Sequence, residues 1–301
     1  MTTAGPSDII YLDHNVTTPA APEVLEAMLP YLTQQYGNPS SDHLLGHRVH
    51  EAVEEAREQV ASLIGAAPDE IVFTSGGTES NNLAIRGSTA VAGPDRRRIV
   101  TSQVEHPAIA HPCEHFEAQG RTVTRLPVTG SGSIDLGILT QALDTDVALL
   151  TVILAQNETG AIMPVAAAAS AARRLGIITH TDAAQAVGKI QVDVDVLGVD
   201  LLSIAGHKCY APKGVGAPYV RGGTPLQPFL LGADQERGLR PGTENVAYIV
   251  GFAAACRLAQ TRLDVEGQRL RGLRDALCSN FEAPSPGWFD TRPRTTACRT
   301  L

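Results

Sequence analysis

Short apolar runs alternate along this sequence with longer segments whose apolar residues recur every three or four positions. A short apolar run predicts a buried strand, and the longer spacing predicts a helix that turns one face to the core. The runs cover residues 70–74, 98–102, 148–154, 176–180 and 201–205. Strands that alternate with helices form right-handed βαβ units. We therefore expect an α/β fold with a mainly parallel central sheet and helices on both faces.

Three helical segments support this arrangement. In 49–64 the apolar residues return at steps of four, three, four and four, and the pattern stops at Gly65, which predicts the end of the helix. Pro22 begins a second helix that we expect to run to about residue 31, because proline suits the first turn. The alanine-rich segment 165–174 is the third.

Polar side chains follow four of the predicted strands at the point where each strand ends. In an open α/β sheet, ligands bind outside the carboxyl ends of the strands, so four neighbouring strand ends predict one shared site. His106 follows the run 98–102, and Asn157 follows 148–154. Asp182 and Gln185 follow 176–180, and His207 and Lys208 follow 201–205.

A glycine turn after residues 70–74 predicts a phosphate cradle. Ser75-Gly76-Gly77-Thr78 leads into a helical pattern, and the free amide hydrogens at a helix start point toward any anion above them. The turn matches neither the G-x-G-x-x-G nor the Walker pattern. Dinucleotides and nucleoside triphosphates are therefore poor candidates for its ligand.

These residue types together suit pyridoxal 5′-phosphate (PLP). A lysine at the edge of an apolar sheet is partly desolvated, so Lys208 has more neutral amine with which to attack a carbonyl. A carboxylate such as Asp182 keeps the ring nitrogen of PLP protonated, which that cofactor needs to act as an electron sink. We expect His106 to stack on the ring, and Asn157 and Gln185 to hydrogen-bond its phenolic oxygen.

Each of these residues, taken singly, fits a structural role as well. Asp182 precedes a helical pattern and could be its N-cap, Asn157 could be a turn residue, and His106 a loop histidine. Only their convergence on one sheet edge favours the cofactor.

Composition and charge limit the classes of partner and the compartment that we expect for this protein. A net charge of −8 argues against nucleic acid and acidic membranes, which need a basic face, and favours a small-molecule substrate. The first residues lack a basic stretch followed by an apolar one, and no run is long enough to span a bilayer. The five cysteines are scattered without a C-x-x-C pair, which suits a reducing compartment and argues against a structural zinc site. We expect a cytoplasmic protein.

Eight ordered motifs resemble the cysteine desulfurase family. This family belongs to the class V aminotransferase group of fold-type I PLP enzymes and includes the selenocysteine lyases. The resemblance covers about residues 9–275. Its motifs occupy residues 11–19, 37–41, 74–82, 104–106, 157–160, 182–185, 206–208 and 240–245.

The resemblance implies removal of sulfur from L-cysteine, which leaves L-alanine and a persulfide on an enzyme cysteine. It implies that Lys208 is the Schiff-base lysine, that His106 takes part in acid–base chemistry and that Asp182 is the partner of the pyridinium nitrogen. Asn157 and Gln185 would contact the cofactor. The sulfur would pass to an acceptor protein, as in iron–sulfur cluster assembly.

The same resemblance assigns the phosphate of PLP to Gly77, Thr78 and His207. Thr243 would reach the phosphate held by the partner subunit, so a homodimer is implied. Ala205 stands where the family commonly has a serine that donates to the phosphate. Loss of that donor would weaken cofactor binding by roughly 1 to 2 kcal/mol if nothing compensates.

The family continues into a small domain that carries the sulfur-accepting cysteine and an arginine for the substrate carboxylate, and this sequence departs from that pattern. We expect an N-terminal segment (1–20), a large PLP-binding domain (21–250), the start of a truncated small domain (251–280) and a disordered tail (281–301). Cys298 in the tail has surroundings unlike the family's loop and receives no role. Cys209 is expected to be a buried filler.

Four functions stay open on the sequence. The first is an active cysteine desulfurase, and the second is a selenocysteine lyase, which depends less on a protein thiol. The third is a PLP-binding but catalytically impaired protein that serves as a scaffold in sulfur transfer. A transaminase or decarboxylase reaction is weaker, because the motifs indicate the desulfurase branch.

Overall fold

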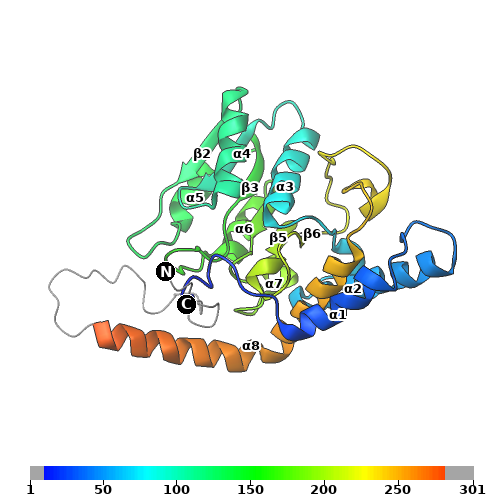
Figure 1. Cartoon of the computed structure of the whole chain (residues 1–301). Helices are drawn as coiled ribbons and strands as arrows, with labels where there is room; N and C mark the ends of the chain where they lie inside the picture. Colours follow the sequence, from blue (N-terminus) through cyan, green and yellow to red (C-terminus); the bar gives the residue numbers. More distant parts are fainter. Residues whose placement is uncertain (1–9, 282–301) are drawn as a thin grey trace, which may run out of the picture.

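The computed structural model describes residues 10–281 and is built on one central sheet (Figure 1). Its six strands lie in the order β2-β1-β3-β4-β5-β6, and all neighbours are parallel except β5 and β6. This confirms the mainly parallel sheet. The strands are β1 (Arg98–Ser102), β2 (Thr122–Leu126), β3 (Val147–Thr151), β4 (Ile178–Asp182), β5 (Leu201–Ala205) and β6 (Gly216–Val220).

The helices are in two groups. Those that accompany the sheet are α3 (Gly77–Val91), α4 (Pro107–Ala118), α5 (Leu136–Ala142), α6 (Val165–Arg173) and α7 (Val194–Leu197). A second group packs together beside β6 and contains α1 (Pro22–Thr33), α2 (Leu44–Ile64) and the long α8 (Val246–Phe281). Short 3-10 turns occur at η2 (Pro68–Glu70), η3 (Gly206–Lys208) and η4 (Gln235–Gly238).

Two hydrophobic clusters show that both faces of the sheet are covered. Ile99 and Leu149 point to one face, where they pack with Ile85 of α3 and Ile109 of α4. The next residue of each strand belongs to the other cluster, which contains the buried alanines of α6. Since successive side chains of a strand alternate between faces, the expectation of helices on both sides is confirmed.

The predicted strand at 70–74 is only partly formed. Ile71 and Thr74 make isolated antiparallel bridges to β6, and Val72 N donates to Pro218 O over 3.0 Å. Pro218 has no N–H to return that bond, so the ladder is interrupted between the two bridges. The segment is extended and buried, but it is not a seventh strand.

Residues 251–280, expected to begin a small domain, form most of α8. The helix begins at Val246 and packs on α1 and α2, with Phe252 and Cys256 fully buried. The predicted boundary at residue 250 therefore falls inside a continuous helix. Residues 282–301 of the expected tail lie outside the described residues. Within 10–281, no helix is both long and apolar enough to span a membrane.

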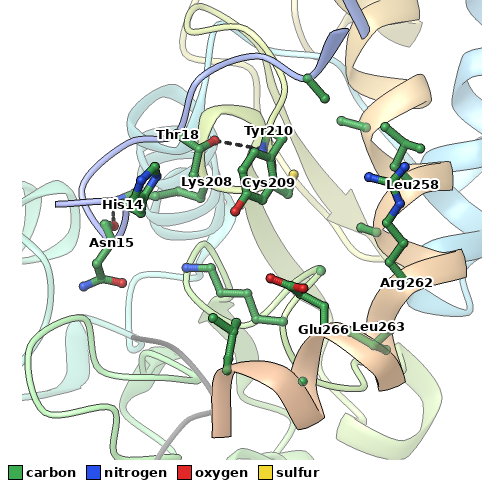
Figure 2. Close-up of a pocket in the computed structure, with 17 residues that line it drawn as sticks. His14, Asn15, Thr18, Lys208, Cys209, Tyr210, Leu258, Arg262, Leu263 and Glu266 are labelled. Carbon is green, nitrogen blue, oxygen red and sulfur yellow. Dashed lines mark hydrogen bonds between the residues drawn. The ribbon is translucent and has the colours of Figure 1, made fainter. Parts of the chain in front are cut away.

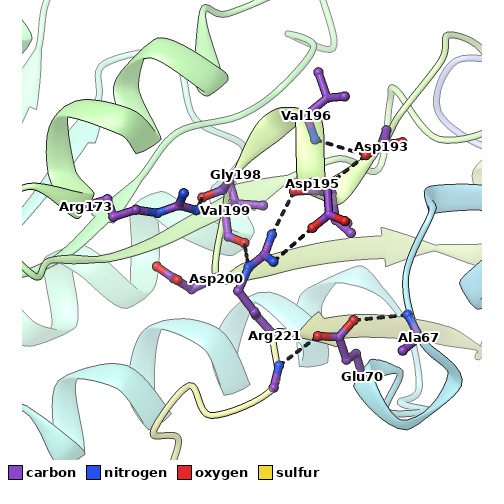
Figure 3. A network of polar contacts seen from close by, with 12 residues as sticks. Ala67, Glu70, Arg173, Asp193, Asp195, Val196, Gly198, Val199, Asp200 and Arg221 are labelled. Carbon is purple, nitrogen blue, oxygen red and sulfur yellow. Dashed lines mark hydrogen bonds and ion pairs between the residues drawn. The ribbon is translucent and has the colours of Figure 1, made fainter.

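A polar network fastens the amino ends of the parallel strands (Figure 3). Arg221 follows β6, donates to the carbonyl of Val199 over 3.0 Å, and pairs with Asp195 of α7 over 3.0 Å. Glu70 accepts from the backbone of Gly222 over 2.8 Å, and Asp200 accepts from the N–H of Thr179 over 2.7 Å. These contacts lie at the amino ends of the parallel strands, while the predicted site lies at their carboxyl ends. We therefore assign the network a role in the stability of the fold and not in the site.

Candidate active site

A cavity of about 460 Å³ lies at the carboxyl ends of the parallel strands. Eight of the nine site residues expected from the sequence line it, although they come from five separate segments. The structure thus brings together the residues that sequence reasoning assigned to one site. They are Gly77, Thr78, His106, Asn157, Asp182, Gln185, His207 and Lys208.

The phosphate cradle forms at the start of α3. Gly76 has a φ of 145°, a conformation that a side chain disfavours, and this turn lets the helix begin at Gly77. A Cβ atom on Gly77 would lie 3.1 Å from Cβ of Ala205, so the turn packs closely on the end of β5. Gly77, Thr78 and Glu79 line the cavity, and the first amides of a helix have no partner within the helix. Their donors fit a phosphate group.

Asp182 is a buried carboxyl group at the cavity wall. Its Oδ1 accepts from the N–H of Ala184 over 2.9 Å, and its Oδ2 accepts from Asn81 Nδ2 over 2.7 Å. It therefore caps the following turn as well as facing the cavity. Burial raises its pKa, against the opposing effects of these hydrogen bonds and of His106 and Lys208. A protonated ring nitrogen in the cavity would offset the cost of this buried charge.

Lys208 meets the N-terminal segment. Its Nζ donates to the backbone oxygen of Asn15 over 2.9 Å, and Gln185 Nε2 donates to the same oxygen over 3.0 Å. Burial lowers the pKa of Lys208, although Asp182 and Asp13 oppose this shift. More of the amine is therefore neutral than in an exposed lysine.

Two histidines lie in fixed orientations. His106 is the N-cap of α4, and its Nδ1 accepts from the N–H of Ala108 over 3.1 Å, so the neutral ring carries its proton on Nε2. His207 Nδ1 lies 3.1 Å from Thr17 Oγ1. Burial lowers the pKa of His207, and the nearby lysines lower it further. His207 is thus neutral near pH 7 and can act as a hydrogen-bond partner.

Two contributions to the site received no role from the sequence, although both residues lie in the motifs at 11–19 and 104–106. One is Asn15, which acts through its backbone carbonyl and whose Nδ2 also donates to the backbone oxygen of Asn157. The other is Glu105, whose buried Oε1 accepts from Ser102 Oγ over 2.5 Å and from Ile153 N over 3.0 Å. Burial raises the pKa of Glu105 to about 8. This carboxyl group joins the ends of β1 and β3, and it precedes His106 in the sequence.

Thr243 is not brought into this cavity. It is exposed in the loop between β6 and α8 and does not line the cavity of its own chain. This position is compatible with the expected role in a partner subunit, which stays a prediction.

A second cavity, of about 340 Å³, adjoins the first at Lys208 (Figure 2). It lies between the N-terminal segment, the chain around Tyr210 and one face of α8. Lys208 is the one described residue that lines both cavities. The charged side chains of Lys189, Arg262 and Glu266 also contribute to the wall of the second cavity.

Comparison with known proteins agrees with this geometry. The family model for class V aminotransferases matches residues 10–279. The chain belongs to the class V aminotransferase family. It is 48% identical over 278 residues to a cysteine desulfurase of Trichormus azollae, covering 92% of this chain and 69% of that protein. It is 49% identical over 286 residues to the cysteine desulfurase IscS of Dictyoglomus turgidum, covering 95% and 73% respectively.

The solved structures place the fold as well. A NifS-like protein superposes with a TM-score of 0.93 at 35% identity, over 96% of this chain and 80% of that one. The chain therefore has the fold-type I architecture expected from its motifs, and PLP is the cofactor of this family. The donor set of the larger cavity fits that cofactor, because it combines a phosphate cradle, a buried carboxyl group and a partly desolvated lysine.

Proposed function

We propose that this chain is a PLP-dependent cysteine desulfurase that converts L-cysteine to L-alanine and transfers the sulfur to a thiol. The observation that carries the proposal is that Lys208, Asp182 and the amides at the start of α3 face one cavity. PLP chemistry requires two groups of a protein, and both are present. One is a lysine with a lowered pKa, Lys208, and the other is a carboxylate that would pair with the ring nitrogen, Asp182.

Different residues of the cavity would bind different groups of the cofactor. Gly77, Thr78 and His207 would hold the phosphate, and Asp182 would hold the ring nitrogen. Gln185 would hydrogen-bond the phenolic oxygen, and Asn157, which lines the same cavity, would do so from its own strand end. When bound, PLP supplies the electron sink that accepts the electron pair released from the amino acid.

Lys208 and His106 would move the protons. The neutral amine of Lys208 would be the nucleophile that holds the cofactor, and it would also act as a base and acid next to the substrate. His106 presents a proton on Nε2, because Nδ1 is occupied by the N–H of Ala108. The acceptor thiolate would attack the sulfur of L-cysteine, and the electron pair of the broken C–S bond would stay on the β-carbon. His106 could give its Nε2 proton to that carbon without changing its orientation.

The second cavity supports an entry route for the amino acid. A substrate must reach the group held by Lys208, and Lys208 is where the two cavities meet. Lys189 and Arg262 lie in the wall and would attract the α-carboxylate of L-cysteine. Lys189 Nζ also donates to Gln185 Oε1 over 2.6 Å, which links this wall to the cofactor contacts.

Three of the four cysteines in residues 10–281 are buried, while Cys278 is partly exposed, and the buried three favour selenocysteine lyase activity as the second candidate. Cys113, Cys209 and Cys256 are buried, and burial raises the pKa of Cys113 to about 12 and that of Cys256 well above its usual value. Buried thiols of this kind are poor nucleophiles. Release of selenium depends less on a protein thiolate, so L-selenocysteine is a candidate substrate of the same site.

Further parts of the proposal concern partners and setting. We infer a homodimer in which Thr243 reaches the other subunit's cavity, a role for which its exposure leaves it available. The released sulfur would serve an acceptor such as an iron–sulfur assembly protein. Free cysteines among the described residues suit a reducing setting such as the cytoplasm.

The test is alanine formation from L-cysteine, with L-selenocysteine in parallel and a small thiol present as sulfur acceptor. The protein is loaded with PLP and compared with Lys208→Ala and with Lys208→Arg, which keeps the positive charge but offers no neutral amine. We expect alanine from the unchanged protein and none from either variant. A PLP-loaded protein that yields no alanine from either substrate would refute the proposal.

A further inference from the structure

The loop between β6 and α8 is hydrogen-bonded to the segment that forms the phosphate cradle. Residues 235–242 of this loop lie against residues 71–79, the extended segment and turn that form the cradle. Two ion pairs make the connection, one fully buried and one beside the cavity. Neither has a role in the chemistry proposed above.

The buried pair joins Arg57 of α2 to Glu236. Arg57 Nη1 and Nη2 donate to the two carboxylate oxygens of Glu236 over 2.8 and 2.9 Å, and the side chains are 5% and 2% exposed. Glu236 Oε2 also accepts from the N–H of Phe73 over 2.7 Å, and Arg57 Nη1 donates to the oxygen of Ile71 over 2.8 Å. Both partners therefore hold the loop and the extended segment in one register.

The loop backbone is strained where this pair forms. Glu236 and Arg237 have φ angles of 49° and 56°, in the left-handed region that side chains disfavour. Such strain persists where the surrounding contacts over-determine the conformation. Gln235 Oε1 accepts from Gly242 N over 2.9 Å, which closes the loop around Arg240. The loop thus presents Arg240 in a fixed position.

The second pair joins Arg240 to the cradle itself. Arg240 Nε donates to Glu79 Oε1 over 3.0 Å, and Glu79 Oε2 accepts from the N–H of Ser75 over 2.6 Å. The Glu79 side chain is 10% exposed and that of Arg240 is 26% exposed. Burial alone would raise the pKa of Glu79, but the hydrogen bonds from Ser75 and Arg240 outweigh it and lower the pKa. Glu79 is therefore a carboxylate.

A carboxylate at this place opposes the proposed ligand. Glu79 lines the cavity within the same turn whose amides would hold a phosphate group. Two anions close together in a partly desolvated site repel each other. The guanidinium of Arg240 cancels the charge of Glu79, while the Glu79 to Ser75 bond keeps the turn in shape.

We propose that Arg240 is a positioning residue of the phosphate cradle. It acts through Glu79, whose charge it neutralises and whose carboxylate it holds against Ser75, and the Arg57–Glu236 pair keeps Arg240 in place. The proposal rests on the part of the proposed function that assigns PLP to this cavity. It does not depend on desulfurase activity.

The test compares binding of PLP with binding of pyridoxal, which lacks the phosphate, by absorbance titration of the protein. Arg240→Ala should weaken PLP binding about tenfold, the equivalent of about 1.4 kcal/mol, and leave pyridoxal binding unchanged. Glu79→Gln keeps an acceptor for Ser75 without the charge. In the double variant Arg240→Ala/Glu79→Gln, we therefore expect most of the PLP affinity to return.

Arg98→Ala is the matched control. It breaks the Arg98–Asp146 pair at the amino end of β1, away from the cavity, and should change neither affinity. Equal losses for PLP and pyridoxal in Arg240→Ala would show a general effect on the fold. An undiminished loss in the Glu79→Gln background would show that Arg240 acts by another route, such as through Thr243. Either result overturns the proposal.

The PLP titration can be distinguished from the test of desulfurase activity. A protein that binds PLP but forms no alanine would refute the desulfurase proposal and leave the cradle proposal to its own titration. A protein in which the unchanged chain binds neither PLP nor pyridoxal would refute both.

Discussion

Replacing Arg57 by methionine should destabilise the protein strongly. The side chain loses two hydrogen bonds to Glu236 and one to the oxygen of Ile71, while methionine keeps most of the apolar contact with Phe73, whose ring centroid lies 4.9 Å from the guanidinium. Because Glu236 is only 2% exposed, water cannot replace the lost partner. Removing one partner of a buried ion pair costs roughly 3 to 5 kcal/mol.

The assay is thermal unfolding of the protein without PLP, so that ligand binding does not contribute. A loss of this size lowers the midpoint by roughly 5 to 8 °C in a chain of this length. The decisive comparison is Arg57→Met/Glu236→Gln, which leaves no unpaired carboxylate, keeps an acceptor for the N–H of Phe73 and should recover most of the lost stability. If the double variant is as unstable as Arg57→Met alone, then packing rather than the orphaned charge sets the cost, and the reasoning is wrong.

Two further predictions concern the cavities, and a third concerns the buried Glu105. Asp182→Asn should lower the rate of alanine formation at least a hundredfold while PLP still binds, because the amide does not favour a protonated ring nitrogen; unchanged kcat would contradict this role. Lys189→Ala should raise the KM for L-cysteine several-fold with little change in PLP affinity, and an unchanged KM would exclude it from the substrate route. The raised pKa of Glu105, about 8 against an ordinary 4.5, means that the protonated group contributes stability below pH 4.5 that is lost as the pH rises through about 8. Denaturant unfolding at pH 6 and pH 9 should show this loss in the unchanged protein and a smaller one in Glu105→Gln.

Much of the sheet could be predicted because β3 and β5 are mainly apolar, and a shorter apolar stretch marks β1 and the start of β4. β1 and β5 have the predicted bounds, and β3 and β4 differ by a few residues at their ends. The two strands that pattern reasoning missed lie at the sheet edges. β2 is half polar, and β6 contains a glycine and a proline, which an edge strand tolerates and a central one does not.

Two of the three predicted helices, α1 and α6, begin at the predicted residue, but the start of α2 was missed. The left-handed Gly65, with a φ of 69°, ends α2 where the sequence indicated. The same helix begins five residues before the predicted 49–64, because His43 Nδ1 accepts from the N–H of Gly46 over 3.1 Å and acts as the cap. Histidine is not among the side chains that normally cap a helix start, so the sequence pattern did not predict a start at this position.

The site was predictable to the extent that it depends on strand ends. Parallel strands deliver the side chains that follow them to one edge, which is why Asp182 and Lys208 could be paired from the sequence. Contacts made through backbone atoms have no such signature. The Asn15 carbonyl receives both Lys208 Nζ and Gln185 Nε2, yet no residue type was needed to provide it.

That shared carbonyl couples the N-terminal segment to the cofactor site. If Lys208 and Gln185 turn to PLP as proposed, the oxygen of Asn15 gives up the two donors that it accepts here. The segment would then be held by contacts that do not involve the cofactor residues' reactive atoms, among them Thr18 Oγ1 to the oxygen of His207 over 2.9 Å. Since Asn15 also lines the second cavity, the exchange of donors takes place at the junction where the amino acid would enter. Capture of the cofactor as proposed would thus break both hydrogen bonds and change the wall of the proposed substrate route at the same time.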